Sequence, residues 1–332
     1  MKKVKSIYLA ILTICAILPF KSIAQTDTRL TQYWEVPSFY NPAATGLTDF
    51  IRIRGGARLQ WLGIDNAPRN FIGVADMPVK IGSKRIGVGV MVNQQTAGLY
   101  HTLNLGAQVS YKLRKLGGLW SFGVQGGMYD QSFKGSEVYI PDDDDYHQGQ
   151  DQGIPTTDIH GTAFDLAAGI RYDHKWFNAA ISCTHITSPT ITMNMENQEG
   201  GSETSGTQKY QFQAKRTFYF IGQGNIPIKN TLFEVIPSVL VRTDLDFTTA
   251  EVTARARYRK FLSFGIGYAW NEGISVNIGA DIKNFYIGYA YEYPTSAIRS
   301  ASSGTHELFV GYSLKLDLSD KNKHRHKSVR IL

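Results

Sequence analysis

Most of this chain alternates between apolar and polar or small residues with a period of two, and this pattern constrains the fold more than any other feature. In residues 247–259, Val252 and Ala254 fall on one face, and Glu251 and Arg255 fall on the other. Successive side chains of a β-strand point to opposite faces, so such a segment is predicted to be a strand. Helical periodicity is scarce, and no apolar run after residue 24 is long enough for a transmembrane helix. We therefore predict an all-β protein.

The residues opposite the apolar face distinguish the two folds that could hold such strands. A soluble β-sandwich leaves that face to water, so it is rich in Lys, Glu and Thr. In residues 262–270 and 274–282 most of these positions are instead Gly, Ala, Ser or Asn. Small residues suit a concave inner wall, and alternating segments of about ten residues are typical of strands whose apolar face meets lipid. We predict a transmembrane antiparallel β-barrel, with a soluble sandwich as the alternative.

The alternating segments give fourteen predicted strands, an even number, as bacterial outer-membrane barrels have. The segments are 50–61, 69–78, 84–96, 100–113, 117–133, 161–173, 175–187, 209–224, 231–243, 245–259, 261–271, 273–283, 284–292 and 303–316. Connections after even-numbered strands are short, whereas 134–160, 188–208 and 293–302 follow odd-numbered strands. If both chain ends are periplasmic, the long loops face the exterior and the short turns face the periplasm.

The N-terminal end has the pattern of a secretory signal peptide. Three lysines precede an apolar stretch at 7–20, and Ser22 and Ala24 place small residues before Gln25. We predict a signal peptide at 1–24, with an N-terminal membrane anchor as the alternative. Cys183 is then the only cysteine, which excludes an intrachain disulfide and a cysteine-based metal site.

The rest of the chain is predicted to have three parts. Residues 25–49 form a periplasmic or plug segment, residues 50–316 form the barrel, and residues 317–332 form a basic periplasmic tail. The chain has 35 Lys and Arg against 28 Asp and Glu, and four of the lysines lie in the predicted signal peptide. The remaining excess of basic residues is confined to the tail, so residues 25–316 are neutral. This balance argues against a nucleic-acid-binding surface spread over the fold.

Charged residues on the predicted inward face indicate an occluded, salt-bridged lumen rather than an open channel. Charges on barrel strands avoid lipid by pointing inward, where they pair with one another or contact water. The segment 25–49 either plugs this lumen or lies on the periplasmic rim. The candidate lumen charge network consists of Arg52, Arg54, Asp165, Arg171, Glu251, Arg255, Arg257 and Asp281.

Two charged runs, one in the longest predicted exterior loop and one in the tail, are candidate partner contacts. Carboxylate clusters can hold Ca²⁺, but the Asp-x-Asp-x-Asp-Gly spacing is absent, so no metal or other cofactor is predicted. We expect the exterior loop to contact an exported protein. The tail is expected either to be solvated or to dock to an acidic periplasmic component or to anionic lipid. The candidate residues are Asp142, Asp143, Asp144, Asp145, Lys323, Arg325 and Lys327.

His306 and Glu307, close in sequence to Ser302 and Ser303, suggest acyl hydrolysis at first sight. A hydroxyl nucleophile needs a base and an acceptor that orients the base. Adjacent residues of a strand point to opposite faces, so His306 and Glu307 cannot form one relay. We expect Glu307 to pair with a lumen arginine and His306 to lie at the rim, and we predict no enzymatic activity.

Four short motifs, in order along the chain, resemble the PorP/SprF family. They are Asn-Pro-Ala at 41–43, Arg-Leu-Gln-Trp-Leu-Gly at 58–63 with Ala-Pro-Arg at 67–69, Gly-Tyr-Ala-Tyr at 288–291, and Thr-His-Glu-Leu at 305–308. The resemblance extends over residues 30–316. Glu292 and Thr305 stand where the family often has Asp and Ser, which leaves the branch open. The motif residues are Asn41, Pro42, Arg58, Gln60, Trp61, Gly63, Pro68, Arg69, Gly288, Tyr289, Tyr291, His306 and Glu307.

The resemblance implies a non-enzymatic barrel of the cell outer membrane, in the type IX secretion and gliding machinery of Bacteroidota. It implies periplasmic and outer-membrane secretion components, exported surface proteins and outer-membrane lipid as partners, and no nucleic acid. We expect the protein to act by protein–protein contact in secretion or in surface anchoring of exported proteins. The alternative is an outer-membrane transporter of hydrophobic small molecules, similar to fatty-acid channels. The arginines predicted to face inward oppose the apolar lumen that such a transporter needs.

Overall fold

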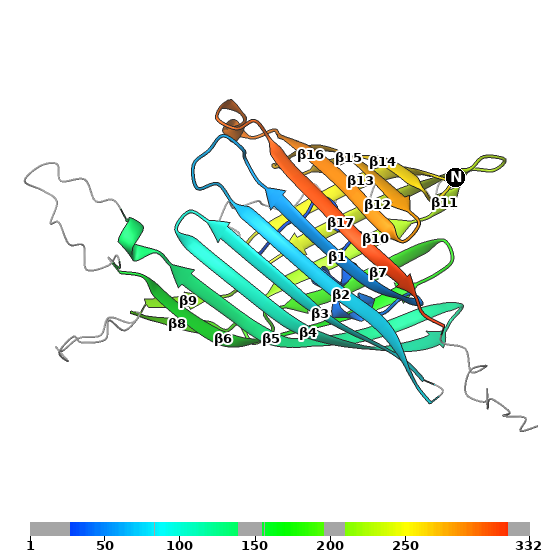
Figure 1. Ribbon diagram of the computed structural model, residues 1–332, viewed down its shortest axis with the longest axis horizontal. Coiled ribbons are helices and arrows are strands. Elements are labelled where there is room, and N and C mark those ends of the chain that lie inside the picture. The colour runs from blue at the N-terminus through cyan, green and yellow to red at the C-terminus, as the bar shows by residue number, and fades with distance from the viewer. Residues whose placement is uncertain (1–26, 83, 139–154, 156, 196–209, 318–332) are drawn as a thin grey trace, which may run out of the picture.

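A closed antiparallel β-barrel of fourteen strands forms the body of the protein in the computed structural model (Figure 1). The structure describes residues 27–82, 84–138, 155, 157–195 and 210–317. The first and last strands pair with each other, so the barrel prediction is confirmed and the sandwich alternative is wrong. The predicted signal peptide lies outside the described residues.

Each of the fourteen predicted segments corresponds to a barrel strand. The barrel strands are β1 Phe50–Leu59, β2 Arg69–Ile81, β3 Lys84–Ala97, β4 Tyr100–Lys115, β5 Gly118–Phe133, β6 Ile159–Asp173, β7 Phe177–Thr184, β10 Thr217–Gly224, β12 Phe233–Thr243, β13 Thr248–Tyr258, β14 Leu262–Ala269, β15 Gly273–Ile282, β16 Phe285–Pro294 and β17 Thr305–Lys315. Three further strands extend the wall: β8 Thr190–Met195, β9 Tyr210–Gln213 and β11 Ile226–Pro227.

The described helices are short: α2 Pro37–Tyr40, η1 Pro42–Ala44, η2 Gly135–Glu137 and η3 Ala297–Ser300. Within the described part of the chain, none is long and apolar enough to cross a membrane.

The two ends of the barrel differ in their connections. One, which we call the short-turn end, has the connections 82–83, 116–117, 174–176, 225–232, 259–261 and 283–284. The other, which we call the long-loop end, has the connections 60–68, 98–99, 134–158, 185–216, 244–247, 270–272 and 295–304. Figure 1 shows the short-turn end on the right, where β17 also ends. In outer-membrane barrels the short turns face the periplasm.

Apolar side chains cover the outside of the wall, and polar side chains line its inside. On β13, the outward Val252 is 54% exposed, whereas its neighbour Glu251 is 3% exposed. On β14, the outward Ile266 is 65% exposed. A closed barrel with this much exposed apolar surface is suited to lipid contact. The predicted inward and outward faces of these strands are therefore confirmed.

The wall is interrupted between β7 and β8. There His185 and Ser188 have positive φ angles of 52° and 45°, which a continuing strand does not adopt. A second break, between β9 and β10, lies at residues 214–216. β6 therefore pairs with β7 toward the short-turn end and with β8 toward the long-loop end. The predicted strand 209–224 is split into β9 and β10. The predicted strand 175–187 is shortened to β7, and β8 lies in the segment predicted as the exterior loop 188–208.

Candidate functional site in the filled lumen

Residues 27–49 precede the first strand and run through the lumen from one end of the barrel to the other; we call them the plug. At the long-loop end, the hydroxyl of Thr28 donates a hydrogen bond of 3.1 Å to the side-chain carbonyl of Asn70. At the short-turn end, Asp49 pairs with Arg85 at 2.7 Å. The sequence leaves open whether this segment plugs the lumen or lies on the periplasmic rim. In the structure it lies in the lumen.

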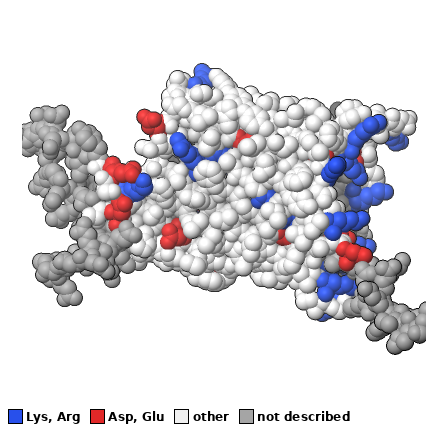
Figure 2. All heavy atoms as spheres, viewed as in Figure 1, with Lys and Arg blue, Asp and Glu red and all other residues white. Residues whose placement is uncertain are grey.

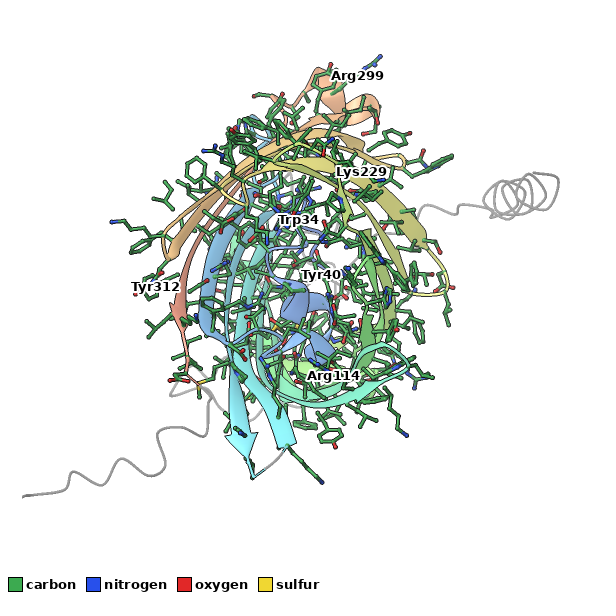
Figure 3. The ribbon with its side chains drawn as sticks, turned by 90° about the vertical axis from the view of Figure 1, so that its right-hand side faces the viewer. Trp34, Tyr40, Arg114, Lys229, Arg299 and Tyr312 are labelled. Atoms are coloured by element: carbon green, nitrogen blue, oxygen red, sulfur yellow. The ribbon has the colours of Figure 1, made fainter. Side chains whose placement is uncertain are left out.

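The plug has an apolar middle that packs against the inner wall. Figure 3 shows Trp34 and Tyr40 within the ring of strands. Tyr40 stacks edge to face on Tyr219 of β10, with ring centroids 5.2 Å apart. Prolines at their first positions start α2 and η1, and the Asn41 side chain accepts a hydrogen bond of 2.8 Å from the Ala43 N–H to cap η1. These short helices let the segment turn within the lumen.

Arg29 of the plug lies among three glutamates of the barrel, two on wall strands and one in the connection 270–272. Its Nη2 atom is 3.0 Å from Glu251 and 2.7 Å from Glu292, and its Nη1 atom contacts Glu272. Burial favours the uncharged form of Arg29, but the three carboxylates outweigh it and raise the pKa of the guanidinium well above its ordinary value. These ion pairs anchor the plug at the long-loop end.

Glu307 of β17 joins the plug to the barrel seam. Its two carboxylate oxygens accept hydrogen bonds from the backbone N–H groups of Thr31 and Gln32, at 2.8 and 2.7 Å. The same carboxylate is 3.4 Å from Nη1 of Arg58 on β1. Arg58 also donates a hydrogen bond of 2.6 Å to the hydroxyl of Thr31 and one of 3.2 Å to the carboxylate of Glu292. A buried carboxylate and a buried guanidinium thus both gain hydrogen bonds from the plug.

The middle of the plug contacts two arginines of the wall. Glu35 lies 3.6 Å from Arg54 of β1. Burial raises the pKa of Glu35, while Arg54 and Arg255 oppose that rise. The guanidinium of Arg255 lies over the ring of Trp34, 4.0 Å from its centroid. The plug therefore contacts both charged arginines through complementary groups.

Toward the short-turn end, the backbone of the plug is held by wall side chains. The N–H of Gly46 donates a hydrogen bond of 2.9 Å to the carboxylate of Asp76 on β2. The same carboxylate accepts a second hydrogen bond of 2.9 Å from Arg52. The carbonyl of Thr45 accepts hydrogen bonds from Ser110 and Lys112. Backbone groups that would otherwise be buried without partners are satisfied in this way.

Glycines of the inner wall are the places where the plug touches the strands most closely. A Cβ atom at Gly123 would fall on the backbone of Pro42 and Ala43, and one at Gly87 would fall on the carbonyl of Thr45. The alternation places such small residues on the inward face, and the backbone of the plug occupies the space that they leave.

His185, in the break between β7 and β8, lies between two carboxylates. Its Nε2 atom is 3.0 Å from Asp27 of the plug, and its Nδ1 atom is 2.8 Å from Asp165 of β6. Burial alone lowers the pKa of His185, but Asp27 and Asp165 overcome this effect and raise it to about 10. Burial favours the protonated form of Asp27, but His185, Tyr219 and Arg242 hold the pKa of that carboxyl well below its usual range. The imidazolium therefore fixes the outer end of the plug.

The eight residues of the candidate charge network lie on wall strands, but their ion pairs are with other residues. Arg52 pairs with Asp76, Arg171 with Asp173, and Arg257 with Glu234, all nearer the short-turn end. Arg54 and Glu251 pair with the plug, and Asp165 pairs with His185. Asp281 is exposed near the end of β15, and no described residue forms an ion pair with it. The partners that sequence reasoning missed are Arg29, Glu35, Asp76, Asp173, His185, Glu234, Glu272 and Glu292.

The motif residues of three strands meet at the seam. Inside the barrel, Arg58 contacts Glu307, as described above. Outside, the Tyr289 hydroxyl lies 2.6 Å from Nδ1 of His306, and the Tyr291 ring packs edge to face on the His306 ring at 5.2 Å. His306 and Glu307 thus point to opposite sides of the wall.

The remaining motif residues shape the plug and the first connection. Asn41 and Pro42 belong to the plug, where the Asn41 side chain also donates to the carbonyls of two wall strands. A Cβ atom at Gly288 would fall on Gln32 of the plug. The first connection includes a backbone hydrogen bond from the Gln60 N–H to the Pro68 carbonyl. Trp61 and Gly63 have positive φ angles in this turn, and Arg69 begins β2.

The plug separates two chambers of the lumen. A chamber of about 420 Å³ at the long-loop end is lined by residues that include Arg58, Trp61 and Glu292. A chamber of about 490 Å³ toward the short-turn end is lined by residues that include Arg52 and Arg171. A third concavity of about 690 Å³ lies on the lipid-facing side of β10 to β15 and is apolar. It is not part of the lumen.

Both candidate partner segments lie outside the described residues. They are the acidic run Asp142 to Asp145 and the tail lysines and arginine Lys323, Arg325 and Lys327. Among the residues that the structure does describe, no group of three or more His, Cys, Asp and Glu side chains could hold a metal ion.

Comparison with solved structures finds a FadL homologue and two toluene transporters at low identity. A Pseudomonas aeruginosa FadL homologue is 9% identical with a TM-score of 0.49, over 84% of this chain and 94% of that chain. The Ralstonia pickettii toluene transporter TbuX is 11% identical with a TM-score of 0.48, over 84% and 93%. The Pseudomonas putida toluene transporter TodX is 8% identical with a TM-score of 0.47, over 88% and 95%. A search of curated proteins finds no match.

A family model of type IX secretion system membrane proteins, PorP/SprF, matches residues 22–312. This span includes the plug and nearly all of the barrel, and it agrees with the resemblance carried by the four motifs. Membership implies association with components of the secretion machinery and, with the barrel fold, a location in the outer membrane. The chain therefore belongs to the PorP/SprF family of type IX secretion system membrane proteins.

Proposed function

We propose that this protein is a non-enzymatic, plugged barrel that acts by protein–protein contact in type IX secretion or in surface anchoring of exported proteins. The observation that carries this proposal is the plug itself. Its ion pairs and hydrogen bonds occupy Arg58, Glu251, Glu292 and Glu307, the polar side chains that an aqueous passage would leave free to contact water or solute. A filled lumen leaves the two ends of the barrel as the working surfaces.

The long-loop end is the proposed contact for exported protein. Its connections 134–158, 185–216 and 295–304 are the longest of the barrel. Loops at one end of a rigid scaffold are well placed to bind partners. The acidic run Asp142 to Asp145 is the proposed centre of this contact.

The short-turn end and the tail 317–332 are the proposed contact for periplasmic components of the secretion apparatus. The same contact serves for gliding components if the protein belongs to a gliding branch of the family. The basic residues of the tail would bind an acidic surface of such a component.

Transport of hydrophobic small molecules is the rival function. It needs an apolar route through the barrel, whereas the chambers on both sides of the plug are lined by arginines such as Arg52, Arg58 and Arg171. The apolar concavity lies on the outer wall, beside the exposed side chains of Val252 and Ile266.

Affinity isolation from outer membranes, followed by mass spectrometry, tests the proposal. We expect type IX components or one abundant surface protein to be recovered with the intact protein. Deletion of 319–332 should lose the periplasmic component alone, and deletion of 139–154 should lose the exported protein alone. Equal recovery from both deletions and the intact protein, with normally assembled barrels, would remove the assignment of these contacts. Recovery of lipid-like ligands without protein would favour the transporter.

A further inference from the structure

Lysines and arginines lie at or beside every turn of the short-turn end and form a basic collar around the barrel. On the face seen in Figure 2, blue lysine and arginine side chains gather at the right-hand end. The collar side chains named in this and the next paragraph are exposed, except Arg85, which is half-buried. Three hairpins carry adjacent pairs: Lys84 and Arg85, Arg114 and Lys115, and Arg259 and Lys260.

The other turns of this end carry single lysines. Lys175 lies between β6 and β7, Lys229 between β11 and β12, and Lys283 between β15 and β16. Lys315 ends β17. The collar therefore follows the whole circumference of the barrel rather than one side of it.

Acidic side chains at this end are fewer, and most are already paired. Asp49 pairs with Arg85, while Asp173 and Glu234 pair with arginines of the inner wall. The collar therefore keeps a positive excess. The acidic residues of the described part of this end are Asp49, Asp173, Glu234, Asp281 and Asp317.

Three collar cations lie over aromatic rings at the edge of the apolar surface. Tyr and Trp side chains at the ends of a membrane barrel lie at the level of the lipid head groups. A cation that stacks on such a ring is held at the same level. The pairs, with the distance from the cation to the ring centroid, are Lys84 and Tyr111 at 5.8 Å, Lys175 and Trp176 at 5.0 Å, and Arg259 and Tyr258 at 5.5 Å.

The geometry points to a binding surface for anionic phospholipid head groups in the leaflet at the short-turn end. Phosphate oxygens of phosphatidylglycerol or cardiolipin would accept hydrogen bonds from the collar ammonium and guanidinium groups. Lipid is favoured over a protein partner because the cations surround the barrel and three of them are fixed to rings at head-group level. A docked protein would use one sector or the mouth. The collar surrounds the short-turn end and leaves the mouth of that end and the tail as the proposed protein contacts.

Native mass spectrometry of the purified full chain, with equal amounts of phosphatidylglycerol and phosphatidylcholine, tests this inference. We expect roughly fivefold more phosphatidylglycerol than phosphatidylcholine to be retained, because each basic side chain near a membrane surface favours anionic lipid by about that factor. The preference should weaken in about 1 M salt, where the Debye length is about 3 Å. The collar variant combines K84Q, K115Q, K175Q and K260Q. The matched control combines K134Q, K215Q, R216Q and R299Q at the long-loop end.

The collar variant should lose most of the preference, and the control should keep it. No preference in the unmodified protein, an equal loss in both variants, or a preference that persists unchanged in high salt would each overturn the inference. Loss of a co-isolated acidic periplasmic protein from the collar variant, with the lipid preference intact, would also overturn it and assign the collar to protein. The salt series on the unmodified chain decides the question even if the fourfold variants do not fold.

Discussion

Arg58 on the first strand and Glu307 on the last face each other across the closing seam, with 3.4 Å between Nη1 and Oε2 and 1% of each side chain exposed. The same carboxylate accepts two backbone hydrogen bonds from the plug. One side chain, Glu307, therefore contributes both to the closing seam and to the anchoring of the plug.

Glu307→Gln should destabilise the barrel by about 3 kcal/mol, because it leaves Arg58 without one of its buried carboxylates and weakens both plug hydrogen bonds. The measurement is the urea midpoint of the fast-migrating folded band on unheated gels. Lys215→Gln, which removes an exposed pair with Asp246, is the matched control and should leave the midpoint unchanged. Equal midpoints for Glu307→Gln and the parent would show that the seam does not depend on this charge.

Gly123→Ala should displace the plug, because the added Cβ atom would fall on the backbone of Pro42 and Ala43. We expect single-channel conductance in planar bilayers to rise above that of the parent. Gly126→Ala on the same strand is the control, since its Cβ atom would meet only side-chain atoms at 3.6 Å or more. If Gly123→Ala conducts no more than Gly126→Ala, the plug does not need this close contact.

Stability should fall as pH rises from 6.5 toward 10. The pKa of His185 is raised to about 10, so its contribution is fully present below 6.5 and is lost as pH rises through 10. The pKa of Asp27 is lowered, so its contribution is present above 3.8 and is lost only in stronger acid. The melting temperature of the parent should therefore be lower at pH 10 than at pH 6.

His185→Gln should remove most of this difference in melting temperature, whereas His306→Gln on the outer surface should keep it. A parent protein with the same melting temperature at both pH values would contradict the charged state of His185.

The orientation in the membrane can be measured with two exposed leucines in opposite turns. Leu245 at the long-loop end is 78% exposed, and Leu116 at the short-turn end is 82% exposed. In a Cys183→Ser background, Leu245→Cys should react with an impermeant thiol reagent on intact cells. Leu116→Cys should react only after the outer membrane is permeabilised. The reverse result would invert the assignment of every loop and turn.

Alternation predicts the barrel because lipid contact imposes one physical rule, an apolar outward face, on every strand. That rule locates β13 and β14 and the inward direction of Glu251 without knowledge of any neighbour. It does not locate the break at His185 and Ser188, because these two left-handed residues leave the pattern on either side intact. The strand breaks were therefore outside what periodicity can detect.

The inward direction of Arg58 and Arg255 also follows from alternation, but their partners do not. A partner depends on the register of strands far apart in sequence and on the path of the plug, which has no period. Asp76 and Glu292 carry a usable signal, since they are charged residues at inward positions of strands. Arg29 and Glu35 carry none before the path of the plug is known.

The plug also bears on the order in which the barrel is assembled. Arg29 lies beyond the apolar contacts of Leu30 and Tyr40, at the end of the lumen opposite the start of β1. To enter a finished barrel from the short-turn mouth, its guanidinium would have to cross that apolar layer without its carboxylates, which is costly. A sheet that curls around the segment before β1 and β17 meet avoids this barrier. Assembly in the membrane would then end with the joining of the two outermost strands over an interior that is already occupied.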